Sequence, residues 1–191
     1  MPISPMMQQY LNIKQQHEHC LLFYRVGDFY EMFFDDAKLA SKELELVLTG
    51  KDCGLTERAP MCGVPHHAVN TYVQRLIEKG YKVAICEQLT EPTKGKQPVE
   101  RDVVRIVTPG TVADSAMLDE KTNAYIVCVY FRGKGAALAY TDVSTGEFWY
   151  MTCSGQEPLS FIEESIIRYS PRECLLLDGT TIDEGVFDSI R

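Results

Sequence analysis

The order of apolar and polar residues over the first 112 positions predicts a mixture of helices and strands. Ser4 followed by Pro5 begins the first predicted helix, because serine caps helices well and proline fits the first helical turn. Apolar residues recur at helical spacing from Val69 to Ile77, and Gly80 can end that helix. The predicted helices cover residues 5–17, 37–44 and 69–77. Runs rich in β-branched and aromatic residues predict strands at 21–26, 29–33, 83–88 and 103–107.

Residues 113–191 follow a different pattern, in which three strands joined by short turns precede a helix and a further strand. The three strands are predicted at 123–131, 136–143 and 147–153. The helix is predicted at 159–169 and the last strand at 174–177. This order is typical of the opening of an RNase H-like α/β unit, which needs more strands and helices than these residues supply. We therefore expect the second part to be truncated.

The composition is that of an ordinary soluble globular protein, with 45% hydrophobic and 24% charged residues. Its apolar stretches are far shorter than the roughly 20 residues of a membrane-spanning helix, and its first residues lack a signal-peptide profile. The seven cysteines contain no CxxC pair, and Cys86 and Cys128 lie in apolar runs, where a thiol acts as a small hydrophobic group. These features predict a cytoplasmic protein with no membrane partner.

Charge is divided unevenly along the chain. The formal net charge is −8, which taken whole argues against a nucleic-acid binder. Residues 1–112, however, hold 13 bases and 14 acids, whereas residues 113–191 hold 6 bases and 13 acids. The two parts meet near Pro109 and Gly110, a turn-forming pair followed by polar residues that predict a linker. The acidity therefore belongs mainly to the second part.

The run Gly27-Asp28-Phe29-Tyr30-Glu31 has the most specific local composition. In an extended chain Phe29 and Glu31 point to the same face, about 7 Å apart, while Tyr30 points away. A flat apolar group would then stand beside a carboxylate hydrogen-bond acceptor. The simpler alternative is a half-buried strand with a core phenylalanine and a solvated glutamate.

Neighbouring charges leave further interpretations open. Four acids lie close together in the sequence: Asp28, Glu31, Asp35 and Asp36. They could hold Mg²⁺ in a metal-dependent nuclease, or they could simply cap a helix or face water. Bases suited to a duplex backbone, on a predicted loop and strand, are Lys94, Lys96, Arg101 and Arg105. The backbone N–H groups of His66 and His67, at a predicted helix start, could meet a phosphate or only cap the helix.

One absent motif bears on catalysis. The nucleotide-binding pattern GxxxxGK[ST] occurs nowhere in the chain, so we expect no P-loop in this stretch. We accordingly expect the chain to be neither an enzyme nor the holder of a cofactor or metal. A structural or protein-binding module is the remaining alternative, above all for the acidic second part.

Four runs, taken in order and spacing, resemble the N-terminal mismatch-recognition domain of the bacterial MutS family. They are LFYRVGDFYEMF at 22–33, PMCGVPHHA at 60–68, VAICEQ at 83–88 and VRIVTPGT at 104–111. The segment from about 123, including DVSTGEF at 142–148, resembles the start of the MutS connector domain. The resemblance implies a mixed-sheet α/β recognition domain at 1–112, a linker at 113–122 and a truncated RNase H-like α/β connector domain at 123–191.

The resemblance also implies roles for individual residues. Phe29 and Glu31 match the family's Phe-x-Glu motif, so Phe29 is expected to wedge into kinked DNA at a mispaired or unpaired base while Glu31 contacts the base. His66 stands where many relatives are expected to carry an aromatic residue. Supporting DNA contacts are expected from Arg25, Val26, Asp28, Val64, Pro65, His66 and Arg105.

The expected partners follow from the same resemblance. They are mismatched double-stranded DNA and, through the connector domain, MutL. ATP, Mg²⁺ and self-association are expected of the longer parent protein and of none of the residues here, and the parent is expected to associate with the nucleoid while it acts.

Overall fold

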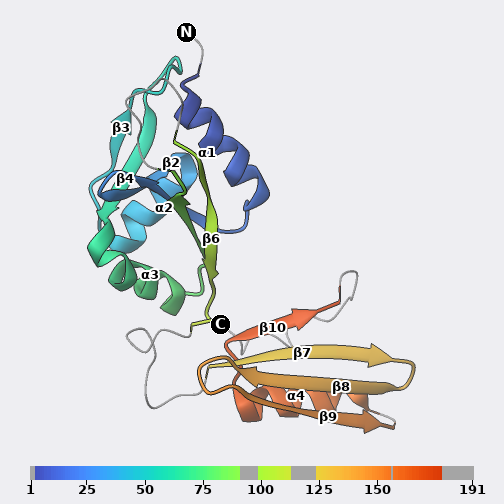
Figure 1. The fold of residues 1–191 in the computed structure, drawn as a ribbon. Coiled ribbons are helices and arrows are strands. Elements are labelled where there is room, and N and C mark those ends of the chain that lie inside the picture. The colour runs from blue at the N-terminus through green and yellow to red at the C-terminus, as the bar shows by residue number, and fades with distance from the viewer. Residues whose placement is uncertain (1–2, 91–98, 113–123, 156, 178–191) are drawn as a thin grey trace. The chain divides into compact units, whose positions relative to one another are not determined.

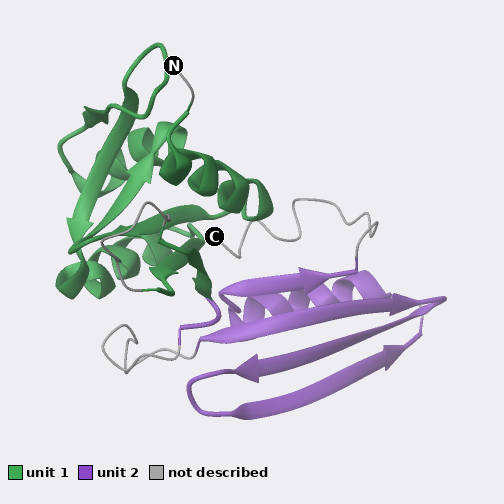
Figure 2. Ribbon diagram, turned by 45° about the horizontal axis from the view of Figure 1, so that its top comes forward, with its two compact units in different colours: residues 1–108 green, residues 109–191 purple. Residues whose placement is uncertain are grey.

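The structure is a computed structural model that describes residues 3–90, 99–112, 124–155 and 157–177. The chain divides into two compact units, residues 1–108 and residues 109–191 (Figure 2). Each unit has its own sheet and its own core. The predicted linker at 113–122 lies outside the described residues.

The first unit is built on a six-stranded mixed sheet with the strand order β3-β4-β2-β1-β5-β6 (Figure 1). Strands β1 and β5 pair in parallel and the other neighbouring strands pair antiparallel. The strands are β1 (Leu21–Val26), β2 (Phe29–Phe33), β3 (Thr49–Lys51), β4 (Ala59–Pro65), β5 (Val83–Gln88) and β6 (Arg101–Val107). The helices are α1 (Pro5–Gln16), α2 (Phe34–Leu44), the 3₁₀ turn η1 (His66–Ala68) and α3 (Val69–Glu78).

Helices cover both faces of this sheet. Helix α1 packs on the face that carries Tyr24 and Phe33, and the Tyr10 ring meets both of their rings edge-on. Helices α2 and α3 pack on the opposite face, where Sγ of Cys62 on β4 donates a hydrogen bond to the carbonyl of Ala37. The alternation of side chains along each strand therefore decides which helix a residue meets.

The predicted elements of the first unit are confirmed, and two strands were not predicted. Strands β3 and β4 occupy a stretch that the pattern left without an element. Pro60, Gly63 and Pro65 give β4 a poor strand propensity, so the local signal is weak. The strand forms because it pairs with five consecutive residues of β2, a long-range partner.

The described residues of the second unit form a four-stranded sheet with one helix against it (Figure 1). Its elements are β7 (Tyr125–Arg132), β8 (Gly135–Asp142), β9 (Glu147–Ser154), α4 (Pro158–Tyr169) and β10 (Glu173–Leu176). The order is β10-β7-β8-β9, with β10 parallel to β7. This arrangement confirms the predicted strands and helix of the second part.

Aliphatic side chains and Tyr140 form the buried core between this sheet and α4, and further aromatic rings pack against it. Tyr140 is fully buried and stacks on Trp149 at 4.3 Å between ring centroids, with Tyr169 of α4 4.9 Å from Tyr140. The prediction that Cys128 acts as a buried hydrophobic group is wrong. Cys128 is exposed, because it alternates with the buried residues Val127 and Val129 and points to the face away from that core.

Neither unit contains a described helix that is both long and apolar enough to cross a membrane. All seven cysteines are free thiols. Four of them, Cys20, Cys53, Cys62 and Cys86, are buried in the first unit.

Gly110 fills a position in the second unit that has no room for a side chain. A Cβ atom there would lie 2.5 Å from Cγ1 of Ile126 and 3.0 Å from Cβ of Glu173. We expect Gly110→Ala to lower the free energy of unfolding of this unit by about 1–3 kcal/mol, because the backbone or Ile126 must shift. Trp149, the only tryptophan in the chain, reports the unit in a urea titration followed by fluorescence.

The matched control for this variant is Gly155→Ala. A Cβ at position 155 meets nothing within 4 Å, so its urea midpoint is expected to equal that of the unaltered chain. Equal midpoints for Gly110→Ala and Gly155→Ala would contradict the steric argument.

Candidate nucleic-acid interface

The hairpin between β1 and β2 places Phe29 directly after its turn. Gly27 and Asp28 make a two-residue turn, and Gly27 adopts a left-handed φ of 58°, which favours glycine. Phe29 begins β2 directly after the turn, opposite Val26 on β1 and Pro65 on β4. Its side chain is 48% exposed. The turn thus presents a large aromatic ring to solvent on a backbone that is paired on both sides.

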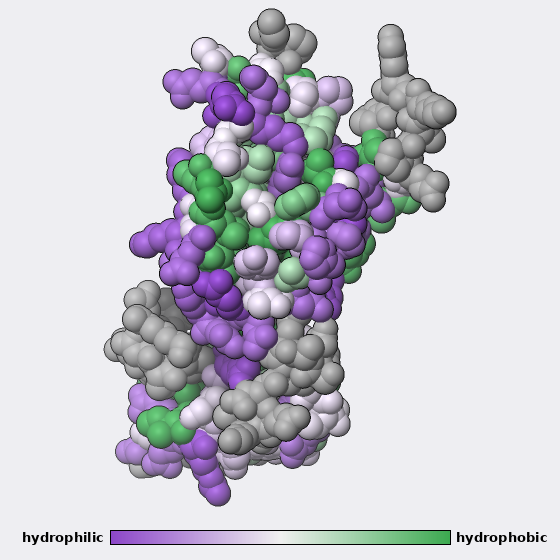
Figure 3. Space-filling model, turned by 90° about the vertical axis from the view of Figure 1, so that its left-hand side faces the viewer, coloured by the Kyte–Doolittle hydropathy of each residue, from purple (hydrophilic) through white to green (hydrophobic). Residues whose placement is uncertain are grey.

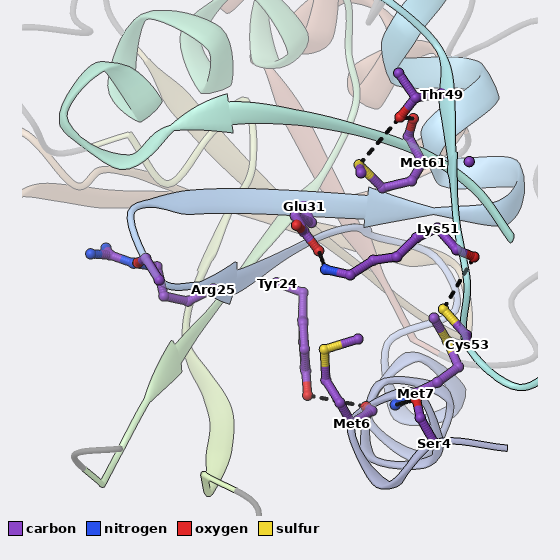
Figure 4. Close-up of polar contacts among 12 residues, drawn as sticks. Ser4, Met6, Met7, Tyr24, Arg25, Glu31, Thr49, Lys51, Cys53 and Met61 are labelled. Atoms are coloured by element: carbon purple, nitrogen blue, oxygen red, sulfur yellow. Dashed lines mark hydrogen bonds and ion pairs between the residues drawn. The ribbon is translucent and has the colours of Figure 1, made fainter. Parts of the chain in front are cut away.

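Glu31 lies two residues further along the same face of β2, but it is not solvated. Its side chain is only 14% exposed, and its Oε2 lies 2.5 Å from Nζ of Lys51 on β3 (Figure 4). The register places Tyr24 and Gly63 on either side of Glu31. The predicted shared face of Phe29 and Glu31 is confirmed, whereas the alternative of a core phenylalanine with a solvated glutamate is wrong.

Two tyrosines next to these residues remain uncharged at neutral pH. Burial raises the pKa of Tyr24 to about 12, against the lowering effect of Arg101, whose guanidinium lies over its ring. Burial and a hydrogen bond to Glu87 raise the pKa of Tyr30 to about 12. The Glu31–Lys51 pair therefore has a neutral hydroxyl-bearing neighbour at Tyr24.

Four of the predicted supporting residues lie around Phe29. Val26 and Pro65 are its cross-strand neighbours. The Asp28 carbonyl accepts a hydrogen bond of 2.9 Å from the backbone N–H of His66, and Nδ1 of His66 lies 3.2 Å from the same oxygen. Because this N–H already donates within the protein, the alternative that it meets a phosphate is wrong for His66.

The other three supporting residues are placed elsewhere. Arg25 belongs to the opposite face, where its guanidinium lies 5.4 Å from the Tyr30 ring centroid. In Figure 4 its side chain points away from Glu31. The Val64 side chain is fully buried beside Tyr30. Arg105 is exposed on β6, three strands away from β2, or roughly 14 Å at the usual strand spacing.

Three of the four clustered acids pair with separate lysines. Asp35 pairs with Lys38 at 2.9 Å, and Asp36 pairs with Lys14 at the same distance. Glu31, as described above, pairs with Lys51. Within the described ranges no group of three or more histidine, cysteine or acidic side chains is arranged to hold a metal ion. These acids therefore stabilise different elements of the fold.

Of the four bases predicted to suit a duplex backbone, Arg101 makes contacts within the fold. Lys94 and Lys96 lie outside the described residues. Arg101 donates from Nε to the carbonyl of Arg25 at 2.7 Å and places its guanidinium 5.0 Å from the Tyr24 ring centroid. Arg101 therefore ties β6 to β1, and Arg105 is exposed.

Hydrophobic groups interrupt the hydrophilic surface of the first unit in the upper part of Figure 3. The large hydrophobic residues that are exposed on this unit include Phe29, Val47, Leu48, Leu89, Val104 and Ile106. Residues 1–112 carry nearly equal numbers of bases and acids. Such a surface suits local contacts by apolar and polar groups better than a grip by a continuous basic stripe.

Lys51 is the residue of this site that sequence reasoning missed. It lies 20 positions from Glu31 in a three-residue strand that the pattern did not predict. The sequence carries no local signal for the pair, since the strand β4 lies between the two residues in the sheet.

Comparison with known proteins assigns both units to one class, the proteins that contain MutS domains I and II. The family model described as MutS domain I matches residues 4–116, and the model described as MutS domain II matches residues 124–185. The chain belongs to the MutS family.

Similar curated proteins carry the name "DNA mismatch repair protein MutS". The protein from Clostridium novyi (strain NT) is 50% identical over 191 residues, which are 100% of this chain and 21% of that protein. The protein from Clostridium botulinum (strain Langeland) is 53% identical over 191 residues, again 100% of this chain and 20% of that protein. The chain thus spans about a fifth of the length of the curated relatives it matches.

Proposed function

We propose that this chain recognises mismatched or unpaired bases in double-stranded DNA as part of mismatch repair. In this proposal residues 1–112 form the recognition domain, 113–122 a linker and 123–191 part of a connector domain. The observation that carries it is the exposed Phe29 ring beside Glu31 on one strand face, in a chain whose similar relatives are named for mismatch repair.

Phe29 supplies the wedge. Inserting an apolar side chain from the minor groove between base steps costs a few kcal/mol of unstacking per step. A mismatch lowers that cost because its bases are already poorly stacked, and the Phe29 ring then stacks on the mispaired base. Readout depends mainly on how easily the DNA deforms, and less on which bases are present.

Glu31 supplies the polar contact. Its carboxylate lies on the same face as Phe29, two residues further from the turn, so a base displaced by the wedge comes within its reach. Perfectly paired DNA offers the carboxylate no such contact. An acid at this position therefore favours mismatched DNA while lowering the affinity for matched DNA.

Other activities of the longer protein are proposed from the resemblance to the MutS family. We assign ATP and Mg²⁺ binding and self-association to parts beyond this chain, whose sequence lacks a P-loop. We assign contact with MutL to the second unit and action at the nucleoid to the whole protein. A pulldown of MutL by the longer protein, with and without residues 123–191, tests the connector role.

Replacing Glu31 tests the polar contact. We expect Glu31→Ala, made in the full-length protein that carries this chain, to reduce the ratio of mismatched to matched affinity by about tenfold, the value of one charge-assisted hydrogen bond. Matched DNA is expected to bind equally well or more tightly, because Lys51 is left unpaired and can attract a phosphate. Competition binding with otherwise identical duplexes at fixed salt measures both affinities.

The matched control is Glu43→Ala, which removes an acid paired with Lys79 on the far side of the unit from α1. It should leave the affinity ratio unchanged. Unchanged binding of Glu31→Ala to both duplexes would remove Glu31 from the proposed site.

A further inference from the structure

The carboxylate proposed to contact a base is already bound within the protein. Its ion pair with Lys51 has an N···O distance of 2.5 Å, and the two side chains are 14% and 28% exposed. Partial burial removes much of the water that weakens exposed ion pairs. The Oε2 atom of Glu31 is therefore occupied by Lys51 before DNA arrives.

The surroundings hold Lys51 in place for this contact. Its carbonyl accepts a hydrogen bond from the Cys53 thiol, and Thr49 donates from Oγ1 to the carbonyl of Met61, which fixes β3 against β4 (Figure 4). The Lys51 ammonium also lies 5.7 Å from the Phe33 ring centroid. The lysine side chain thus reaches across β4 along a defined path.

Gly63 keeps that path open. It lies on β4 opposite Glu31, and a Cβ there would stand 3.7 Å from the Glu31 Cγ and 3.2 Å from the Tyr30 carbonyl oxygen. A longer side chain at this position would occupy the space next to the carboxylate. The glycine therefore leaves the Glu31 side chain room to move between partners.

We propose that Lys51 sets mismatch discrimination by competing with the displaced base for the Glu31 carboxylate. This inference rests on the proposed function of Glu31. On matched DNA the carboxylate stays on Lys51, and the pair presents no net charge to the duplex. On mismatched DNA the carboxylate moves to the base and leaves the ammonium without its partner. Lys51 is a positioning residue that acts through Glu31.

The sign of the effect follows from comparing the two complexes. Without Lys51, the matched complex retains an unpaired carboxylate, whereas the mismatched complex still gives Glu31 its base. Both complexes lose one positive charge near DNA, so that loss cancels in the ratio of affinities. What remains is the energy of the Glu31–Lys51 pair, which had favoured the matched complex. Lys51→Met should therefore widen discrimination, by about fivefold for an ion pair of this exposure.

The experiment measures four variants of the full-length protein in competition with matched and mismatched duplexes at two salt concentrations. Lys51→Met keeps the aliphatic stem beside Phe33, and Lys51→Arg keeps a cation that can pair with Glu31. Glu31→Gln and the double variant Glu31→Gln, Lys51→Met complete a double-mutant cycle. Lys38→Met is the control, since Lys38 pairs with Asp35 on helix α2 and both side chains are largely exposed.

We expect Lys51→Met to raise the ratio of mismatched to matched affinity. Lys51→Arg and Lys38→Met should leave this ratio nearly unchanged. In the Glu31→Gln background, Lys51→Met should have no effect on the ratio. High salt should reduce this increase in the affinity ratio of Lys51→Met, because it screens the unpaired carboxylate. A Lys51→Met ratio that is unchanged or narrower, while Glu31→Gln alone changes the ratio, would overturn the inference and leave the proposed function standing. If Glu31→Gln alone changes nothing, the proposed role of Glu31 fails first.

A structural effect of the substitution is separated by two readouts. Thermal unfolding of Lys51→Met shows whether the first unit remains folded. If that variant does not fold, the Lys51→Gln variant replaces it in the cycle with the same expected direction. An equal widening in the presence and absence of the Glu31 carboxylate would also overturn the inference, because Lys51 would then act by another route.

Discussion

Phe29→Ala removes the preference for mismatched DNA, with an expected loss of about 10- to 100-fold in the ratio of affinities. Stacking of one base on an aromatic side chain contributes about 1–3 kcal/mol, and alanine offers no ring. The side chain is 48% exposed and does not belong to the hydrophobic core cluster around Tyr10 and Tyr24, so the variant should remain folded. Matched DNA, which is not wedged open, should bind nearly as before.

Two further variants make this result specific. Phe29→Leu keeps an apolar side chain without an aromatic face and should retain an intermediate preference. Phe148→Ala removes a phenylalanine ring that is 68% exposed on β9 of the second unit, and it should leave the preference unchanged. Competition binding with mismatched and matched duplexes supplies the ratio. A full preference in Phe29→Ala would show that the wedge assignment is wrong.

Asp36→Ala is expected to lower the free energy of unfolding of the first unit by about 2–4 kcal/mol. Asp36 is 9% exposed. Its carboxylate accepts two hydrogen bonds, from the backbone N–H of Leu22 at 3.0 Å and from Lys14 Nζ at 2.9 Å. Alanine leaves an ammonium and a buried amide without this partner, and such losses are among the most destabilising single changes. The residue ties α1, β1 and α2 together.

The neighbouring acid provides the control. Asp35→Ala removes a carboxylate that is 94% exposed and pairs with Lys38, so its cost should stay below about 0.5 kcal/mol. Amide hydrogen exchange of β1 reports the first unit, and Trp149 fluorescence reports the second. Similar exchange protection in both variants would contradict the role given to Asp36. A shifted Trp149 midpoint would mean that the effect is not confined to the first unit.

The order of elements and the main features of the site could be read from local patterns. Alternation along residues 29–33 places Phe29 and Glu31 on one face because successive strand residues point to opposite sides. Gly27 and Asp28 form a turn because glycine accepts a positive φ. Both properties depend on residues that are adjacent in sequence, which is why the sequence sufficed.

Only the tertiary structure decided which of those side chains are exposed and which are paired. Glu31 meets Lys51 because β4 joins two strands that lie far apart in the sequence, and no local pattern encodes that register. The same long-range pairing buries Val64 and puts Arg105 three strands away from Phe29. The sequence by itself determined the elements, the turn and the shared face of Phe29 and Glu31. Sheet register, set by contacts between distant residues, decided that the Phe29 side chain is exposed and that the Glu31 carboxylate is paired with Lys51.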